Sequence, residues 1–234
     1  NKKDKENKNG YKDVNLKINQ TFKTLFFTTV PMTLGLSFLS VPVWHTFYGA
    51  STYGPIVFRF SIVVALVTVL LSTSQVIAYT FKEFKILIPS VVAGLVLNAV
   101  FDVPLMLLID KLGGYAFYGA TLSTCLGHIL TITLILVLIG RKYNLKLKES
   151  FKSAISTILY TVIMLGVLYL LTFIVPLDNP NRIVSLLITI LYTLVGGTVY
   201  LLISYKTGLL QQVFGNNVLE KVKEKLHLKK RVVE

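Results

Sequence analysis

The chain has 234 residues, of which 53% are hydrophobic and 15% charged, and its formal net charge is +13. Soluble domains carry about 25% charged residues, so this composition excludes an ordinary soluble domain. A strongly positive net charge can indicate nucleic-acid binding. Here the basic residues lie between long apolar blocks, without an aromatic-basic recognition face, which argues against a nucleic-acid partner. The sequence therefore predicts an all-α integral membrane protein.

The amino-terminal segment, residues 1–20, is polar and rich in lysine. Such a segment cannot bury enough apolar surface to fold alone, so we expect a solvated cytoplasmic loop or tail. The chain begins with Asn1 and a polar stretch, which is not a signal peptide. We therefore expect either a processed protein or the C-terminal part of a longer one.

The first apolar span, 22–47, contains Pro31, and we expect this proline to bend the helix. Aromatic residues around Trp44 gather at the end of the span, as they do at membrane interfaces, and His45 beside them is expected to be an interfacial polar residue.

The second span, 56–80, carries one charge, Arg59, about one turn inside its start. A long basic side chain at such a position ordinarily reaches back to the interface. Gln75 lies in the polar second half of the same span. Amide side chains of this kind hydrogen-bond across helix interfaces.

The third span, 86–109, contains a single charged residue, Asp102. Gly94, Asn98 and Asp102 follow one another at intervals of four, so they share one helix face. An ionisable residue inside a membrane needs a partner, a wet cavity or a protonated state. The polar stripe is therefore expected to face protein or water rather than lipid.

Three further apolar spans follow at 120–139, 153–175 and 183–205, each long enough to cross a membrane. The last two contain no charge and are expected to be packing helices rather than a transport pathway. The tail, 206–234, has apolar residues every four positions (Val218, Val222, Leu226) and a Lys-rich face. This pattern predicts an amphipathic helix suited to an anionic lipid surface; a solvated tail helix is the alternative.

Six spans place both ends of the chain on one side of the membrane. Of the 24 Lys and Arg residues, seven lie in 1–23, two in 81–86, five in 141–152 and seven after 205, all on that side. Cytoplasmic loops carry such an excess, so we expect both termini in the cytoplasm of a multi-pass plasma-membrane protein.

In this topology Arg59 and Asp102 both lie in the outer half of the membrane. An α-helix rises about 1.5 Å per residue, so their depths differ by only a few ångströms. We hypothesise that they form an intramembrane ion pair, with Asn98 and Gln75 as the other polar residues of a substrate pathway.

Motifs of enzymes are absent from the sequence: there is no HExxH, GxSxG, Walker loop or Cys/His cluster with metal spacing. We expect no enzyme, no cofactor and no metal. A channel would need filter rings or a re-entrant loop, and neither is visible. Kinked spans and a polar stripe at depth favour part of a transporter, which needs a second bundle to form a central cavity.

Several short motifs occur in a characteristic order. They are a Pro-x-x-x-Gly-Leu helix at Pro31, a Thr-Ser-Gln helix end at Thr73, a short charged loop, a Pro-Ser helix with Asn98, and a Tyr-Gly-Ala-x-x-Ser-Thr helix start at Tyr118. Over nearly its whole length the chain resembles the C-terminal portion of the polysaccharide-biosynthesis and lipid II flippase family, the kind that includes stage V sporulation protein B-like proteins. That family belongs to the multidrug, oligosaccharidyl-lipid and polysaccharide exporter superfamily.

The resemblance implies a bacterial plasma-membrane flippase that moves a lipid-linked saccharide precursor of the cell wall between leaflets by alternating access. It implies an N-terminal bundle in the same protein or in a partner chain, and it assigns no substrate-binding residue to this chain. Two alternatives stay open. One is a segment of a cation-coupled multidrug exporter, which a buried acidic residue suits, and the other is a non-transporting membrane scaffold or half-protein.

Overall fold

The computed structural model describes residues 2–215, with side chains from Asp13 onward. Every regular element in this part of the chain is an α-helix, which confirms the predicted all-α class. In chain order the helices are α1 (Lys2–Phe38), α2 (Ser40–Tyr48), α3 (Gly54–Thr80), α4 (Phe84–Lys111), α5 (Ala116–Tyr143), α6 (Lys148–Leu171), α7 (Arg182–Lys206) and α8 (Leu209–Phe214). The predicted tail helix around Val218 and Val222 lies outside the described residues.

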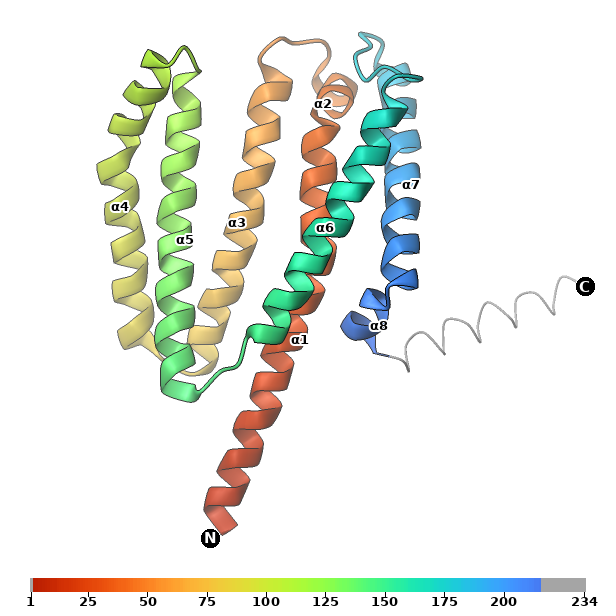
Figure 1. Ribbon diagram of the computed structural model, residues 1–234. Coiled ribbons are helices and arrows are strands. Elements are labelled where there is room, and N and C mark those ends of the chain that lie inside the picture. The colour runs from red at the N-terminus through yellow and green to blue at the C-terminus, as the bar shows by residue number, and fades with distance from the viewer. Residues whose placement is uncertain (1, 216–234) are drawn as a thin grey trace, which may run out of the picture.

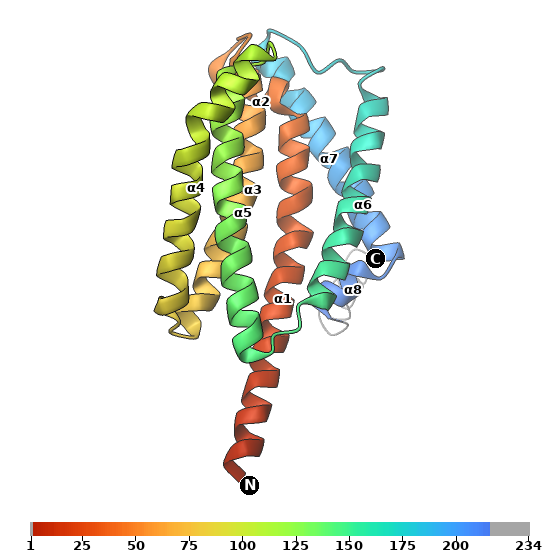
Figure 2. The same cartoon turned by 60° about the vertical axis from the view of Figure 1, so that its left-hand side comes forward.

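The helices form an elongated bundle (Figure 1). The α4–α5 pair lies on one side, α6 and α7 lie on the other, and α1 and α3 lie between them, an order that Figure 2 also shows. Within the described residues, the five helices α3 to α7 are each long and apolar enough to cross a membrane, and the bent pair α1–α2 makes a sixth span if counted as one. The protein is therefore a multi-pass membrane protein.

The first span is broken at Leu39, where the helix axis turns by 72°. Pro31 lies inside the continuous helix α1, so the expected bend at Pro31 is instead found eight residues later. Pro42 explains the position, because it has no N–H to bond the Phe38 carbonyl and its ring crowds that carbonyl. The chain resumes as α2 with Pro42 in its first turn, where proline is tolerated.

The polar amino-terminal segment also differs from expectation, because residues 2–20 are helical rather than a loop. Lys and Glu are good helix formers, and extending an existing helix is far easier than nucleating one. The packed end of this segment supplies the nucleus, since Ile18, Asn19 and Phe22 are buried. The result is a first helix that continues past the bundle at its amino-terminal end (Figure 1).

The sixth helix is displaced relative to the predicted span 153–175, since it begins at Lys148 and ends at Leu171. Hydropathy did not detect the first turn of α6, because the residues from Lys148 to Ser150 in that turn are polar. At the other end Pro176 disfavours helical geometry in the residue before it. The Tyr192 hydroxyl then donates to the Val175 carbonyl at 2.5 Å, which fixes the chain as it leaves the helix.

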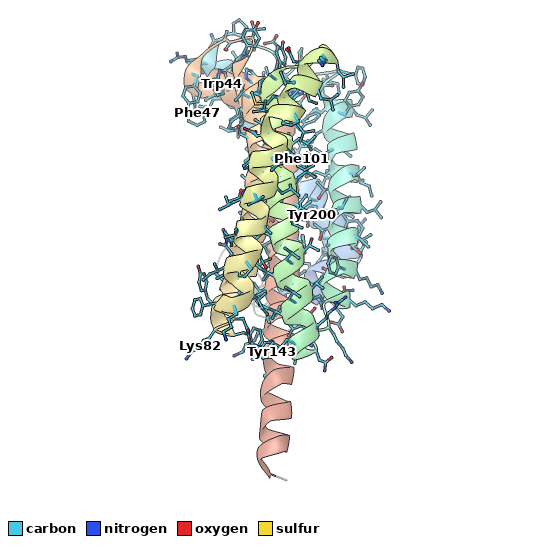
Figure 3. The ribbon with its side chains drawn as sticks, turned by 90° about the vertical axis from the view of Figure 1, so that its left-hand side faces the viewer. Trp44, Phe47, Lys82, Phe101, Tyr143 and Tyr200 are labelled. Carbon is cyan, nitrogen blue, oxygen red and sulfur yellow. The ribbon has the colours of Figure 1, made fainter. Side chains whose placement is uncertain are left out.

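Aromatic and basic side chains mark the two ends of the bundle. Figure 3 shows Trp44 and Phe47 at one end, and Lys82 and Tyr143 at the other, where the described chain also has both of its ends (Figure 1). Three separate small cores, rather than one, hold the helices together. One joins α1, α3, α4 and α5 around Phe22 and Ile135, and the other two join α1 or α2 to α6 and α7 around Tyr200 and Tyr192.

Candidate functional site

The predicted polar stripe of α4 faces helix α5. We call this contact the α4–α5 seam; its residues are Ser90, Gly94 and Asn98 on α4, and Ser123, Gly127 and Thr131 on α5. A Cβ placed on Gly94 would lie 2.0 Å from the Thr131 hydroxyl oxygen and 2.6 Å from the Gly127 carbonyl oxygen. The backbones therefore approach closely, as small residues allow between membrane helices.

Hydrogen bonds close the seam at both ends. The Ser123 hydroxyl lies 2.7 Å from the Asn98 carbonyl oxygen and 2.8 Å from Asn98 Oδ1, and both oxygens accept from it. The Thr131 hydroxyl lies 3.2 Å from the Ser90 carbonyl oxygen. The expectation that Gly94 and Asn98 face protein is thus met, and Asn98 has a structural partner.

Asp102 lies one turn beyond Asn98 and is half-buried. Within the described residues it makes no hydrogen bond and no ion pair. Arg59 is not its partner, because the Arg59 Nε donates to the Ser40 hydroxyl at 3.1 Å. The structure therefore does not bring the hypothesised pair together in this conformation. Gln75 is half-buried on α3 and makes no hydrogen bond to a described residue.

Arg59 lies at the end of the bundle where the first span is broken, in a wall shared by two hollows. The two hollows have volumes of about 510 and 680 Å³, and Arg59 and Asp178 line both. Ser37 of α1 donates to the Arg59 carbonyl at 3.3 Å. The C-terminal carbonyls of α1 carry partial negative charge, which favours a cation at this position.

The wall opposite Arg59 is the loop between α6 and α7. His45 of α2 is buried, with its Nδ1 at 3.0 Å from the Asn179 carbonyl oxygen and 3.7 Å from Asp178 Oδ1. Asn181 caps α7 by accepting from the Ile183 N–H at 2.9 Å. The hollow thus combines a guanidinium, a carboxylate and an imidazole, which can bind the polar part of a ligand by charge and hydrogen bonding.

Sequence reasoning missed Asp178, and it missed the contact of His45 with the loop between α6 and α7 that contains Asp178. The available signals were Pro42, which breaks the helix, and the polar sequence between Pro176 and Arg182. Neither signal says which loops meet, because that depends on how the helices pack.

An apolar groove lies between α1, α6 and α7. Helices α6 and α7 are the last two spans, which were expected only to pack. It encloses about 350 Å³, and its walls include Gly35, Met164, Gly196, Gly197 and Tyr200. Gly196 packs on Leu168, whose Cδ1 would be 3.2 Å from a Cβ at that position, whereas a Cβ on Gly197 would meet nothing within 4 Å. One glycine brings the helices together and its neighbour leaves the groove open.

The floor of the groove is held by Tyr200, shown at mid-height in Figure 3. Its hydroxyl donates to the Phe27 carbonyl at 2.9 Å, and its ring packs on the Phe27 ring with centroids 5.2 Å apart. The groove has few polar atoms to offer, so an apolar chain is the ligand that its chemistry fits.

Comparison with known proteins gives one informative match. The chain is 28% identical over 217 residues to the lipid II flippase MurJ of Bacillus subtilis (strain 168), and the match covers 89% of this chain. The chain is a distant homologue of MurJ. It spans 38% of the length of that relative. No family model matches the chain, and no solved structure matches it.

The homology to MurJ agrees with the family that the ordered motifs indicated. MurJ is named as a flippase, which is a transporter rather than an enzyme. In the described residues no group of three or more His, Cys, Asp or Glu side chains could hold a metal ion.

Proposed function

We propose that this chain forms part of a flippase that carries a lipid-linked saccharide precursor of the bacterial cell envelope across the plasma membrane by alternating access. The observation that carries the proposal is the apolar groove between α1, α6 and α7, which suits the lipid chain of such a molecule. The homology to the lipid II flippase MurJ supports the choice of substrate class.

The polar end of the pathway is proposed to include the hollow around Arg59 and Asp178. Arg59 offers a guanidinium whose planar donors match phosphate and carboxylate groups, and the space around it is large enough for part of a headgroup. The apolar groove and this hollow lie on different flanks of the α1–α6 contact. A second bundle, from the same polypeptide or a partner chain, completes the cavity in this proposal.

The proposed orientation puts both termini in the cytoplasm. The basic residues between the spans gather at the end of the bundle that holds Lys82 and Tyr143 (Figure 3), as positively charged cytoplasmic loops do. The hollow around Arg59 then opens near the outer surface.

The test uses the matched pair Gly197→Leu and Gly166→Leu. Both glycines have open space at the Cβ position, but only Gly197 is a groove residue. In cells whose only copy of the protein carries Gly197→Leu, we expect outer-leaflet exposure of the lipid-linked precursor to fall at least about tenfold, a barrier change of about 1.4 kcal/mol.

Gly166→Leu is expected to leave that exposure within about twofold of the unaltered protein, since a surface change of this kind has little effect. Equal exposure in the two variants, with equal amounts of protein in the membrane, contradicts the proposed role of the groove. An unchanged leaflet distribution after depletion of the whole protein contradicts the flippase proposal itself.

A second candidate function, a cation-coupled exporter, is favoured by Asp102. A half-buried carboxyl group inside the membrane with no partner among the described residues can take up a cation or a proton. Asp102→Asn removes that capacity. Drug efflux that depends on an ion gradient and is lost in Asp102→Asn, with unchanged precursor exposure, supports this function over the first.

A further inference from the structure

A second hollow, about 1470 Å³, lies at the opposite end of the bundle from Arg59, and the proposed function makes no use of it. It is formed by the middle of α1, the end of α5, the loop that follows and the start of α6, which lie side by side in Figures 1 and 2. We call it the basic hollow; its lysines are Lys142, Lys146, Lys148 and Lys152.

The backbone of the basic hollow is held in place by two asparagines of α1. Asn19 is buried, and its Nδ2 donates to the Lys146 carbonyl at 2.8 Å, while its Oδ1 accepts from the Ser150 hydroxyl at 2.6 Å. Asn15 Oδ1 accepts from the Lys146 N–H at 3.3 Å. These bonds fix the backbone of Lys146 and do not use its ammonium group, which is left free to contact a ligand.

Two carboxylates at or near the basic hollow, Glu149 in its wall and Glu83, already have lysine partners. Glu149 pairs with Lys23 of α1 at 2.9 Å, and Glu83 pairs with Lys142 at 2.5 Å. Within the described residues Lys146, Lys148 and Lys152 form no ion pair. Three ammonium groups of one sign thus share a hollow, and an anion is the ligand that relieves their repulsion.

Exposed apolar side chains border the same hollow. Leu16, Phe151 and Ile155 line it and are 67%, 58% and 68% exposed, respectively. Phe151 and Ile155 are four residues apart and share one face of α6, which continues toward the middle of the span. A small soluble anion makes no use of such a face, whereas an amphiphile can place its charge on the lysines and its chains along the helix.

We propose that the basic hollow binds the phosphate headgroup of an anionic phospholipid from the leaflet on the side of the amino terminus. Its acyl chains lie along Phe151 and Ile155. Basic pockets between membrane helices bind anionic headgroups by this combination of charge and depth. The inference rests on different residues from the proposed flippase function and does not depend on it.

The test is lipid binding to the purified, detergent-solubilised protein, measured by native mass spectrometry during titration with phosphatidylglycerol. The variant Lys146→Gln/Lys148→Gln/Lys152→Gln removes the three free ammonium groups. The matched control is Lys82→Gln/Lys85→Gln/Lys206→Gln, which removes the same charge from exposed positions outside the hollow.

Each juxtamembrane lysine strengthens anionic lipid binding severalfold, so the first variant is expected to bind phosphatidylglycerol at least about tenfold more weakly. The control is expected to bind like the unaltered protein, and phosphatidylcholine is expected to bind to none of the three. Equal weakening in both triple variants overturns the proposal, because it shows attraction to net charge alone.

Two further arms separate the lipid from a free anion. Phe151→Ser/Ile155→Ser is expected to weaken phosphatidylglycerol binding while leaving any binding of glycerol phosphate unchanged. Inorganic phosphate at concentrations that match the lipid is expected not to displace it. Displacement by phosphate, or no effect of the serine variant, overturns the assignment to a lipid. If the triple variant fails to fold, the single variant Lys152→Gln replaces it in the same measurement of phosphatidylglycerol binding.

Discussion

The α4–α5 seam and the groove between α1, α6 and α7 use the same residue type for opposite purposes. In the seam a Cβ on Gly94 or Gly127 would overlap the backbone of the facing helix, and the same holds for Gly119, two turns before Gly127 on α5 in the same contact between α4 and α5. In the groove Gly35 and Gly197 have room beside them, and the neighbouring helices enclose about 350 Å³. Glycine in a membrane helix thus permits either a tight pair or an open space, and the facing surface decides which. The seam belongs to a rigid pair, and the groove belongs to the part that can receive a ligand.

The substitution with the largest expected effect on this difference between the two regions is Gly119→Ala. The added Cβ would lie 2.4 Å from both the Leu105 carbonyl carbon and the Met106 nitrogen. Backbone atoms cannot move aside cheaply, so we expect the free energy of unfolding in detergent to fall by about 3 kcal/mol. Gly140→Ala on the same helix is the control, because a Cβ there meets nothing within 4 Å. Equal stability of the two variants contradicts the tight seam.

The hydrogen bonds of the seam contribute less than its close packing. Asn98→Ala removes the side-chain acceptor of the Ser123 hydroxyl but leaves the Asn98 carbonyl as an acceptor. We expect the free energy of unfolding to fall by about 1 kcal/mol. Ser72→Ala, which removes a bond within a single helix, is the control and is expected to change stability by less than half of that.

On the groove side, Tyr200→Phe removes the hydroxyl bond to the Phe27 carbonyl and keeps the ring. Hydrogen bonds between membrane helices contribute about 0.6 kcal/mol on average, and we expect a loss of that size in a thermal or chemical unfolding experiment. Tyr169→Phe, on the exposed surface of α6, is expected to have no effect. If Tyr200→Phe lowered the free energy of unfolding by more than Asn98→Ala does, the hydrogen bond of the groove would contribute more to stability than that of the seam, which is the opposite of what we expect.

A pH effect is expected at the turn that joins α3 to α4, next to the seam. Hydrogen bonds from Lys142 and Tyr143 hold the pKa of the Glu83 carboxyl below its ordinary value of 4.5. Because the pKa is lower in the folded than in the unfolded protein, the stabilisation is complete above pH 4.5 and is lost as the pH falls through the folded pKa.

We therefore expect the melting temperature to fall more steeply on acidification below pH 4.5 in the unaltered protein than in Glu83→Gln. The effect is expected to be small, because Lys142 is 55% exposed and water screens the pair. Asp110→Asn, an exposed change at the other end of α4, is expected to retain the steeper dependence. Identical pH profiles for the unaltered protein and Glu83→Gln argue against a contribution from this pair.

The smallest expected effect concerns Asp102, one turn beyond the seam on α4, and Arg59, which lies in the hollows at the end of the first span. Because Arg59 bonds to Ser40 rather than to Asp102, a double-mutant cycle of Arg59→Ala and Asp102→Ala is expected to show coupling below about 0.3 kcal/mol. The charge-swapped pair Arg59→Asp/Asp102→Arg is expected to give no rescue of stability. Coupling above about 1 kcal/mol would restore the ion pair as a feature of the fold.

The sequence allowed the approximate spans and the packed face of α4 at Gly94 and Asn98 to be predicted, because both depend on patterns along one helix, but it did not identify α5 as the helix that this face contacts. Long apolar runs set where α3 to α7 cross the membrane, and the four-residue spacing of Gly94, Asn98 and Asp102 set which face of α4 packs. The Arg59–Asp102 pair was inferred from depth alone. Depth fixes the height of a residue in the membrane but not its direction around the bundle, and α5 takes the place beside α4 that the inference gave to α3.

The break in the first span illustrates a second limit. Pro31 and Pro42 carry the same local constraint, yet the helix continues through Pro31 and turns before Pro42. Beyond the turn α2 packs Trp44 against Gly54, where any Cβ would overlap the indole ring. This packing depends on a residue ten positions later, so helix propensity could not distinguish the two prolines.

Helix α1 contributes to all three of the spaces described above, with the asparagines of the basic hollow at its middle, the groove residues in its C-terminal third and Ser37 of the Arg59 hollow near its end. Its 37 residues make a rod of about 55 Å. Asn19 and Ser37 are 18 residues apart, so the basic hollow and the Arg59 hollow lie about 27 Å apart along one continuous helix. Because α1 is continuous between these positions, a shift of this helix along its axis would change the walls of all three spaces together.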